Sequence, residues 1–212
     1  MVDRMPRPMR TPAPPRALRL AGCALLLAGC IAGCIEVPPP PPKPPLEAKE
    51  IQVSEGVGLE VACTPTGVEL CFDALDNNCN GVIDEGCGLH TGILQFTIAW
   101  EEADADVDLN VYDTSGELAR VGEPTAGGLM KDRDCPRVSG ECQDQNVENV
   151  FLTEGEPARG RYRVVVRLDK LNGATAPVRV RLSARVGHRS YAMALELSPS
   201  AATEEKSFSF TL

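Results

Sequence analysis

The feature that most constrains the fold is an alternation of apolar and polar residues with a period of two. From Thr91 to Leu212 such runs are short and are separated by Gly, Asn and Pro. Alternation of this kind is typical of half-buried antiparallel strands. The clearest runs lie at residues 94–100, 107–111, 162–168, 178–186, 191–197 and 208–212. We expect an all-β domain over residues 91–212, an antiparallel, jelly-roll-like β-sandwich with one core.

Composition limits both the core and the partners of this chain. Aromatic residues make up 4% of the sequence, so the core has to be built mainly from Val, Leu, Ile and Ala. The formal net charge of -9 argues against nucleic acid as a partner, because a phosphate backbone requires a basic surface. With His90 and His188 as the only histidines, the sequence offers little for histidine-based catalysis.

Residues 1–33 have the pattern of a secretory signal: several arginines, then a short apolar stretch ending in small residues. Leu27–Cys30 and Ile31–Cys34 each end in Ala-Gly-Cys, which resembles the bacterial lipoprotein signal. The resemblance implies a lipid anchor. Cys34 is favoured over Cys30, because anchoring at Cys30 would leave Cys34 as an odd thiol in an oxidising compartment. We therefore expect an exported, lipid-anchored protein at the bacterial outer membrane, in the periplasm or on the cell surface.

A proline-rich segment follows the predicted anchor. Residues 37–45 contain seven prolines in nine positions. Such a run favours polyproline II, at about 3.1 Å per residue, and does not join a packed core. We expect residues 34–62 to be a disordered, semi-rigid stalk that holds the folded part off a membrane, in preference to a ligand for an SH3-type domain.

Four cysteines spaced eight residues apart precede the predicted sandwich: Cys63, Cys71, Cys79 and Cys87. Zinc sites favour short C-x2-4-C spacings, and exported thiols normally oxidise, so two disulfides are favoured over a zinc site. Four cysteines allow three pairings, and the sequence does not choose among them. Residues 63–87 show no apolar periodicity, so this module depends on its disulfides.

A loop rich in Asp and Asn lies inside this cysteine array. Oxygen-bearing side chains occupy every second position and a glycine follows, as in the first half of an EF-hand calcium loop. Five groups would face a cation in that register: Asp76, Asn78, Asn80, the Val82 carbonyl and Asp84. The twelfth position is Cys87 instead of a bidentate Glu, so we expect weak affinity. The alternative is that these residues only form tight turns between disulfides.

Residues 63–87 resemble the MopE-type metal-binding repeat of secreted bacterial proteins, roughly PE-x-C-D-G-x-D-N-D-C-D-G-x-x-D-E. The resemblance rests on the cysteines, Asp76-Asn77, Gly81 and Asp84-Glu85. Phe72-Asp73 replaces an Asp-Gly pair, and Asn78 and Asn80 replace aspartates. The resemblance implies metal binding, and the calcium-loop pattern makes Ca²⁺ the expected cation.

Two further features lie inside the predicted sandwich. A polar row with period two consists of Asp104, Asp106, Asp108 and Asn110. Neighbouring carboxylates repel unless solvent or a cation neutralises them, so Asp106 and Asp108 are a second, weaker candidate metal site, with a solvated face as the alternative. Cys135 and Cys142 predict a local disulfide, because C-x6-C lacks the short spacing of thioredoxin-like redox sites.

The order of several short motifs gives the C-terminal domain a second resemblance. Trp100 and residues 106–116, 127–132, 147–152 and 160–166 follow the pattern W…DVDLxV…G…GG…D…EN…G-x-Y-x-V-x-V. This resembles the YfaP-like and pre-peptidase C-terminal β-sandwich domains of exported bacterial proteins. The resemblance implies a non-catalytic accessory module, of a kind thought to bind calcium or polysaccharide in some members.

The residues that an enzyme would need are not marked. Neither His90 nor His188 lies in a signature such as G-x-S-x-G, so we expect no catalysis, with a secreted hydrolase as a remote alternative. The leading hypothesis is a lipid-anchored envelope protein whose accessory module binds Ca²⁺ and contacts glycan or protein. The alternative is a purely structural subunit of an envelope complex, without metal. Expected partners are the membrane, through the lipid anchor, and an envelope protein or polysaccharide.

Overall fold

The computed structural model describes residues 41–48, 50–53, 60–61, 67–136, 142, 145–199 and 204–212. The signal segment, both candidate lipidation sites and Cys63 lie outside these residues, and so do the predictions made for them. The chain divides into two units, Met1–Pro42 and Lys43–Leu212. Within the described residues, no helix is long and apolar enough to cross a membrane.

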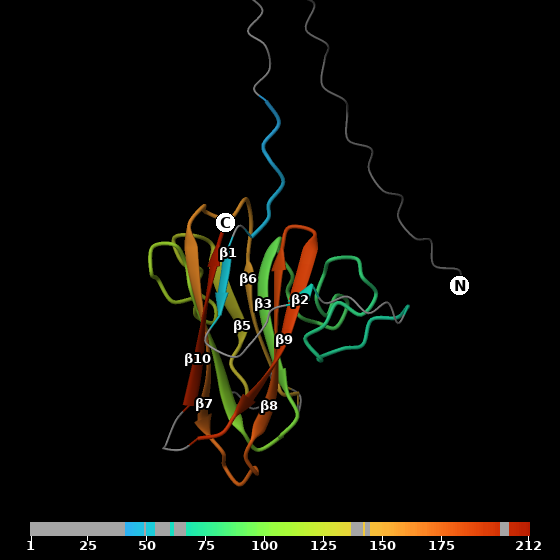
Figure 1. Ribbon diagram of the computed structural model, residues 1–212, viewed down its shortest axis with the longest axis vertical. Helices are drawn as coiled ribbons and strands as arrows, with labels where there is room; N and C mark the ends of the chain where they lie inside the picture. Colours follow the sequence, from blue (N-terminus) through green and yellow to red (C-terminus); the bar gives the residue numbers. More distant parts are fainter. Residues whose placement is uncertain are drawn as a thin grey trace, which may run out of the picture. The chain divides into compact units, whose positions relative to one another are not determined.

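The described part of the second unit contains ten strands in two antiparallel sheets (Figure 1). The four-stranded sheet has the order β1 (Glu50–Val53), β10 (Glu204–Thr211), β7 (Arg161–Lys170), β4 (Asp106–Tyr112). The six-stranded sheet has the order β2 (Glu60–Val61), β9 (Arg189–Leu197), β8 (Val178–Val186), β3 (Leu94–Trp100), β6 (Val147–Leu152), β5 (Leu129–Arg133). The predicted all-β sandwich is confirmed.

The core lies between the two sheets, where the alternating apolar residues of both meet. Leu109 and Val111 of β4 and Val164 and Val166 of β7 are completely buried, whereas the residues between them on β4 are only half-buried. Phe96 of β3 packs edge-to-face on a phenylalanine of β10, with 5.2 Å between ring centroids. Burying one such side chain contributes about 1.5–3 kcal/mol, so the alternation supplies the main driving force of folding.

The predicted stalk ends earlier than expected, because β1 and β2 lie inside residues 34–62. Main-chain pairing joins β1 to β10 and β2 to β9, so this one segment borders both sheets. Before β1, Leu46 and Ala48 pack against the core, and Lys43 pairs with Glu156 at 2.7 Å. The physical reason is that the dense proline run ends at Pro45, and the Glu-Ile-Gln-Val sequence of β1 has the strand alternation.

The Cys-rich module, described here as residues 67–90, has no strand of its own and covers part of the outer face of the six-stranded sheet (Figure 1). Ala74 and Ile83 are completely buried. The side chain of Gln95 donates to the Ile83 carbonyl at 3.3 Å, and that of Asn149 donates to the His90 carbonyl at 2.7 Å. As a result β3 and β6 are buried on both faces, and the module belongs to the sandwich.

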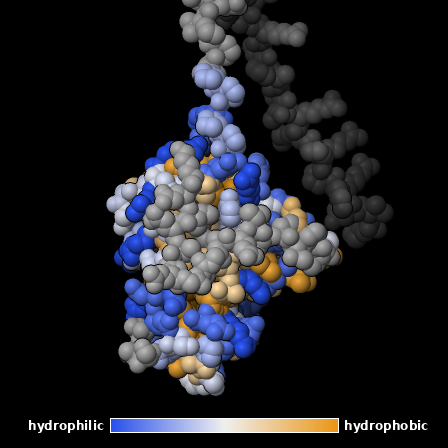
Figure 2. Space-filling model, viewed as in Figure 1, coloured by the Kyte–Doolittle hydropathy of each residue, from blue (hydrophilic) through white to orange (hydrophobic). Residues whose placement is uncertain are grey.

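Among the coloured residues on the face shown in Figure 2, hydrophilic ones prevail and apolar ones lie in scattered spots. Val68 and Leu70 are the most exposed large apolar residues in the described part of the chain, and both belong to the Cys-rich module. The module therefore keeps few apolar groups for its own interior, and other interactions have to hold it together.

Candidate metal centre

Disulfides close the module. Cys71 and Cys87 are bonded, with 5.3 Å between their Cα atoms and a sequence separation of 16. Cys79 is disulfide-bonded as well. Disulfides rather than zinc are therefore confirmed for these three cysteines, whose sulfurs are not thiolates.

The metal loop is wound around the carboxylate of Asp76. Its Oδ1 accepts the Asn80 N–H at 3.0 Å, and its Oδ2 accepts the Gly81 N–H at 2.9 Å and the Ser190 hydroxyl at 2.8 Å. Gly81 has φ +85° and packs against the turn between β8 and β9. A Cβ added to Gly81 would lie 2.6 Å from the carbonyl oxygen of His188 in that turn. The loop therefore requires glycine at this position.

Three side chains converge beside Asp76. The side-chain amides of Asn78 and Asn80 both donate to Oε1 of Glu85. Oε2 of Glu85 is buried and has no hydrogen-bond partner among the described residues. A buried carboxylate oxygen without a partner is costly, and a bound cation would satisfy it. Glu85 was not among the predicted ligands, although it belongs to the Asp-Glu pair of the repeat pattern.

Asp84 has a different role from the one predicted for it. Its carboxylate accepts the N–H groups of residues 72, 73 and 74 at 2.7, 3.3 and 3.1 Å. Burial and, to a smaller extent, the nearby Asp73 raise the pKa of Asp84 to about 7, although the three backbone donors lower it. Of the predicted ligands, the structure brings Asp76, Asn78 and Asn80 together with Glu85. Asp84 instead holds the backbone of residues 72–74, which precede the loop in the sequence. Val82 donates its N–H to Asn80 Oδ1 at 2.8 Å.

Glu69 is a second acid that sequence reasoning missed. Its carboxylate accepts the N–H groups of Asn77, Asn78 and Asp84 at 3.1, 3.2 and 3.0 Å. Burial raises the pKa of Glu69, and the nearby Glu85 adds to this effect. No local sequence signal marks it, because its partners lie 8 to 15 residues further along the chain. Carboxylates that bind backbone N–H groups thus replace an apolar core in the module.

The donor atoms at this centre suit a hard cation. Asp76, Asn78, Asn80 and Glu85 offer oxygen ligands, which Ca²⁺ prefers, whereas copper favours nitrogen and sulfur donors. Burial lowers the pKa of the neighbouring Arg185, while Asp76 and Glu85 raise it. This guanidinium shares the field of the two carboxylates and so reduces the charge available to a cation.

The second candidate site is divided between two places. Asp106 lies 3.9 Å from the ammonium of Lys170. Asp108 instead joins Asp134 and Glu148, and carboxylate oxygens of these three residues lie within 4.8 Å of one another. Burial raises the pKa of Asp108. Asp108 thus clusters with Asp134 and Glu148, while Asp106 lies beside Lys170 and adds to the raised pKa of Asp108 through its charge.

An ammonium group already neutralises the cluster around Glu148. Lys131 Nζ lies 2.7 Å from Glu148 and 2.8 Å from Asp134. Glu148, which is completely buried, also accepts the N–H groups of Leu109 at 2.6 Å and Cys135 at 3.0 Å. Burial would lower the pKa of Lys131, but Glu148 and Asp134 outweigh this and raise it. This arrangement is a buried ion-pair network.

The predicted local disulfide lies next to this network. Cys135 and Cys142 are bonded, with 5.8 Å between their Cα atoms. Because the backbone N–H of Cys135 is bound by Glu148, this cysteine of the disulfide is held against the core. The prediction of a structural disulfide is confirmed.

The comparisons with known proteins agree with the reading of the module. Residues 60–85 match the family model described as "Putative metal-binding motif", the Cu-binding MopE motif. No curated protein and no solved structure matches the chain. The match confirms the MopE-type resemblance for this segment and a metal-binding motif in the chain. The oxygen ligands of the centre do not fit the copper in the name of the motif.

Proposed function

We propose that the chain is a non-catalytic accessory protein of the bacterial envelope whose Cys-rich module binds Ca²⁺. The ligands are Asp76, Asn78, Asn80 and Glu85, with the Val82 carbonyl as a fifth. The observation that carries the proposal is the convergence of two asparagine amides on Glu85, whose second oxygen is buried and unpartnered among the described residues. The side-chain oxygens of Asn78 and Asn80 already accept the N–H groups of Asn80 and Val82. Ca²⁺ binding therefore requires these oxygens to share or give up those hydrogen bonds, while the cation replaces the amide N–H groups at Glu85.

The ligand set supports weak binding. Two carboxylates face two neutral amides, and Arg185 lies close enough to interact with both carboxylates. Low ligand charge is typical of extracellular calcium modules, which bind with Kd values of about 0.1–1 mM. A site of this strength fits a protein outside the cell, where Ca²⁺ is abundant.

Export and lipid anchoring are part of the same proposal. The signal pattern of residues 1–33 supports export, with Cys34 as the lipidated residue and Cys30 as the alternative. The Cys71–Cys87 and Cys135–Cys142 disulfides are consistent with an oxidising compartment. Mass spectrometry of the membrane-extracted protein tests this part: a diacylated or triacylated N-terminal Cys34 supports it, and an unprocessed Met1 contradicts it.

One observation favours the rival, a structural subunit without metal. Glu69 and Asp84 bind backbone N–H groups within the module, so much of the loop is held in place by the protein itself. The two functions differ in whether Ca²⁺ changes stability. A structural subunit would be indifferent to Ca²⁺ and to loss of the Glu85 charge.

The deciding experiment is a Ca²⁺ titration of the full chain in detergent after treatment with a chelator. At ten times Kd, binding should stabilise the fold by about 1.4 kcal/mol, which is about 3–6 °C in Tm. Glu85→Gln should weaken binding about tenfold, the equivalent of 1.4 kcal/mol. The matched control is Asp104→Asn, at an exposed acid outside the module, which should leave binding unchanged. The absence of any stabilisation at millimolar Ca²⁺ rules the proposal out.

A further inference from the structure

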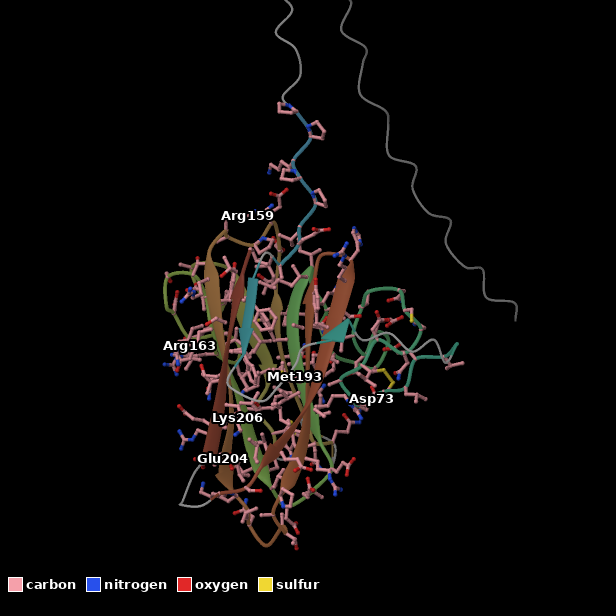
Figure 3. The ribbon with its side chains drawn as sticks, viewed as in Figure 1. Asp73, Arg159, Arg163, Met193, Glu204 and Lys206 are labelled. Atoms are coloured by element: carbon pink, nitrogen blue, oxygen red, sulfur yellow. A yellow bond between two sulfur atoms is a disulfide. The ribbon has the colours of Figure 1, made fainter. Side chains whose placement is uncertain are left out.

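The module leaves one part of the six-stranded sheet uncovered, and a groove of about 470 Å³ lies there. Its floor includes Ala99 of β3 and Ala194 of β9, whose short side chains leave space between longer neighbours. Phe72 and Asp73 of the Cys-rich module form one side. Figure 3 shows Asp73 on the module, beside the six-stranded sheet. A volume of this size is within the range of small-ligand sites, about 300–1,000 Å³.

The groove offers hydrogen-bond donors and acceptors side by side. Arg179 of β8 lies 3.6 Å from Glu101 and 3.9 Å from Glu196, which is too long for good hydrogen bonds. A ligand hydroxyl can fit between such groups, because it donates to a carboxylate and accepts from a guanidinium. Arg181 donates to the Asp73 carbonyl at 2.8 Å and so joins the module to this face of the sheet.

Charge and topology narrow the ligand class. The carboxylates of Asp73, Glu101 and Glu196 outnumber the two arginines by one, so the groove does not favour a polyanion. A peptide added as an extra strand needs a free sheet edge, but β8 is paired on both sides, with β3 and β9. A neutral molecule with many hydroxyls matches paired donors and acceptors above a partly apolar floor, with Phe72 at the rim.

We propose that this groove binds a neutral oligosaccharide and that Ca²⁺ bound by the module raises its affinity. The coupling between the calcium site and the groove rests on the proposed function, in which Glu85 is a calcium ligand. The adjacent Asp84 accepts the backbone N–H groups of Phe72 and Asp73, which form one side of the groove. Ca²⁺ bound at Glu85 would restrain Asp84 further, and through it the backbone that forms one side of the groove. Because such coupling is reciprocal, the oligosaccharide also raises the affinity for Ca²⁺.

The test is a binding titration of the full chain in detergent with soluble cello-, malto-, xylo- and chito-oligosaccharides, with Ca²⁺ and with a chelator. Ala194→Leu fills the floor at an exposed position and should abolish binding. Ala126→Leu, at an exposed alanine outside the groove, is the matched control and should bind like the wild type. Arg179→Ala should weaken binding about tenfold, the value of one charge-assisted hydrogen bond.

The outcomes separate this proposal from the proposed function. Oligosaccharide binding that Ala194→Leu removes and that Ca²⁺ strengthens supports the proposal. If Ca²⁺ binds but none of the four oligosaccharide series does, the groove proposal is overturned and the calcium proposal stands. Binding of an acidic polysaccharide or a peptide that Ala194→Leu removes overturns the ligand class. Equal oligosaccharide affinity with Ca²⁺ and with chelator overturns the coupling.

Discussion

Replacing Lys131 by Met tests whether Glu148 is held in the core as a compensated charge. Glu148 is completely buried, the Lys131 side chain is 8% exposed, and the two charged groups are 2.7 Å apart. Methionine retains the unbranched apolar stem but removes the ammonium. Breaking one side of a buried pair costs about 3–5 kcal/mol, because the remaining charge is left without its partner.

The loss should depend on pH in a defined direction. Burial raises the pKa of Glu148 well above its ordinary value of 4.5, and Lys131 offsets only part of this effect. Lys131→Met removes that offset and raises the pKa of Glu148 further. The folded state then binds the proton more tightly than the unfolded state does. The contribution of Glu148 to stability is therefore highest below about pH 4.5 and falls as the pH rises toward the folded-state pKa, by up to about 1.4 kcal/mol per pH unit.

Urea unfolding followed by circular dichroism at pH 4.5 and pH 7.5 measures both effects. With a slope of about 2 kcal/mol per molar urea, the variant's midpoint should fall by about 2 M at pH 7.5 and by much less at pH 4.5. Lys170→Met is the matched control, since Lys170 is 55% exposed and its surface ion pairs should contribute under about 1 kcal/mol. An equal loss at the two pH values, or a loss below about 1 kcal/mol at pH 7.5, would refute the reasoning.

Three further predictions concern the module. Gly81→Ala should destabilise the fold more than Gly86→Ala does, as measured by Tm, because both glycines have positive φ but only at position 81 would the Cβ meet backbone; equal shifts would contradict this. Replacing Cys71 and Cys87 together by Ala should lower the free energy of unfolding, measured in urea, by about 3 kcal/mol. It should also weaken Ca²⁺ binding, and an unchanged Ca²⁺ affinity would show that the disulfide does not position the ligands. In the metal-free wild type, the raised folded-state pKa of Asp84 makes the protein lose stability as Asp84 ionises between pH 4 and pH 7. Asp84→Asn should reduce this loss, and a variant with the wild-type pH profile would show that Asp84 is not its cause.

The sandwich was predictable from sequence because each long strand carries its apolar residues on one face, which only a second sheet can cover. The burial of β3 and β6 on both faces was not. Gln95 and Thr97 are polar and alternate with core residues, so they predicted a half-buried strand. They are buried, as is Asn149 of β6, because the module lies on them and forms hydrogen bonds with Gln95 and Asn149. Such burial depends on packing between distant segments, which period-two alternation does not report.

The candidate metal centre was predictable to the extent that its contacts are local. Asn80 and Val82 donate their N–H groups to side chains two residues earlier, a geometry that the Asp/Asn repeat itself encodes. Glu85 and Glu69 were missed because their hydrogen-bond partners lie 5 to 15 residues away in the sequence, beyond the reach of the local repeat. The different roles of Asp84 and Glu85, which are adjacent in the sequence, arise only when the backbone of residues 72–74 is in place.

The pairing of β1 with β10 has a mechanical consequence. Lys43 pairs with Glu156 and Leu46 packs against the core. Strand β1 then begins beside the C-terminal end of β10, where Glu50 pairs with Thr211, and runs antiparallel to it through four residue pairs. A pull on the N-terminal side of β1, directed along the strand, loads these pairs together in shear rather than separating them one after another. A tether attached there would transmit tension into the centre of the four-stranded sheet through β10, and the Cys-rich module would stay outside the loaded path.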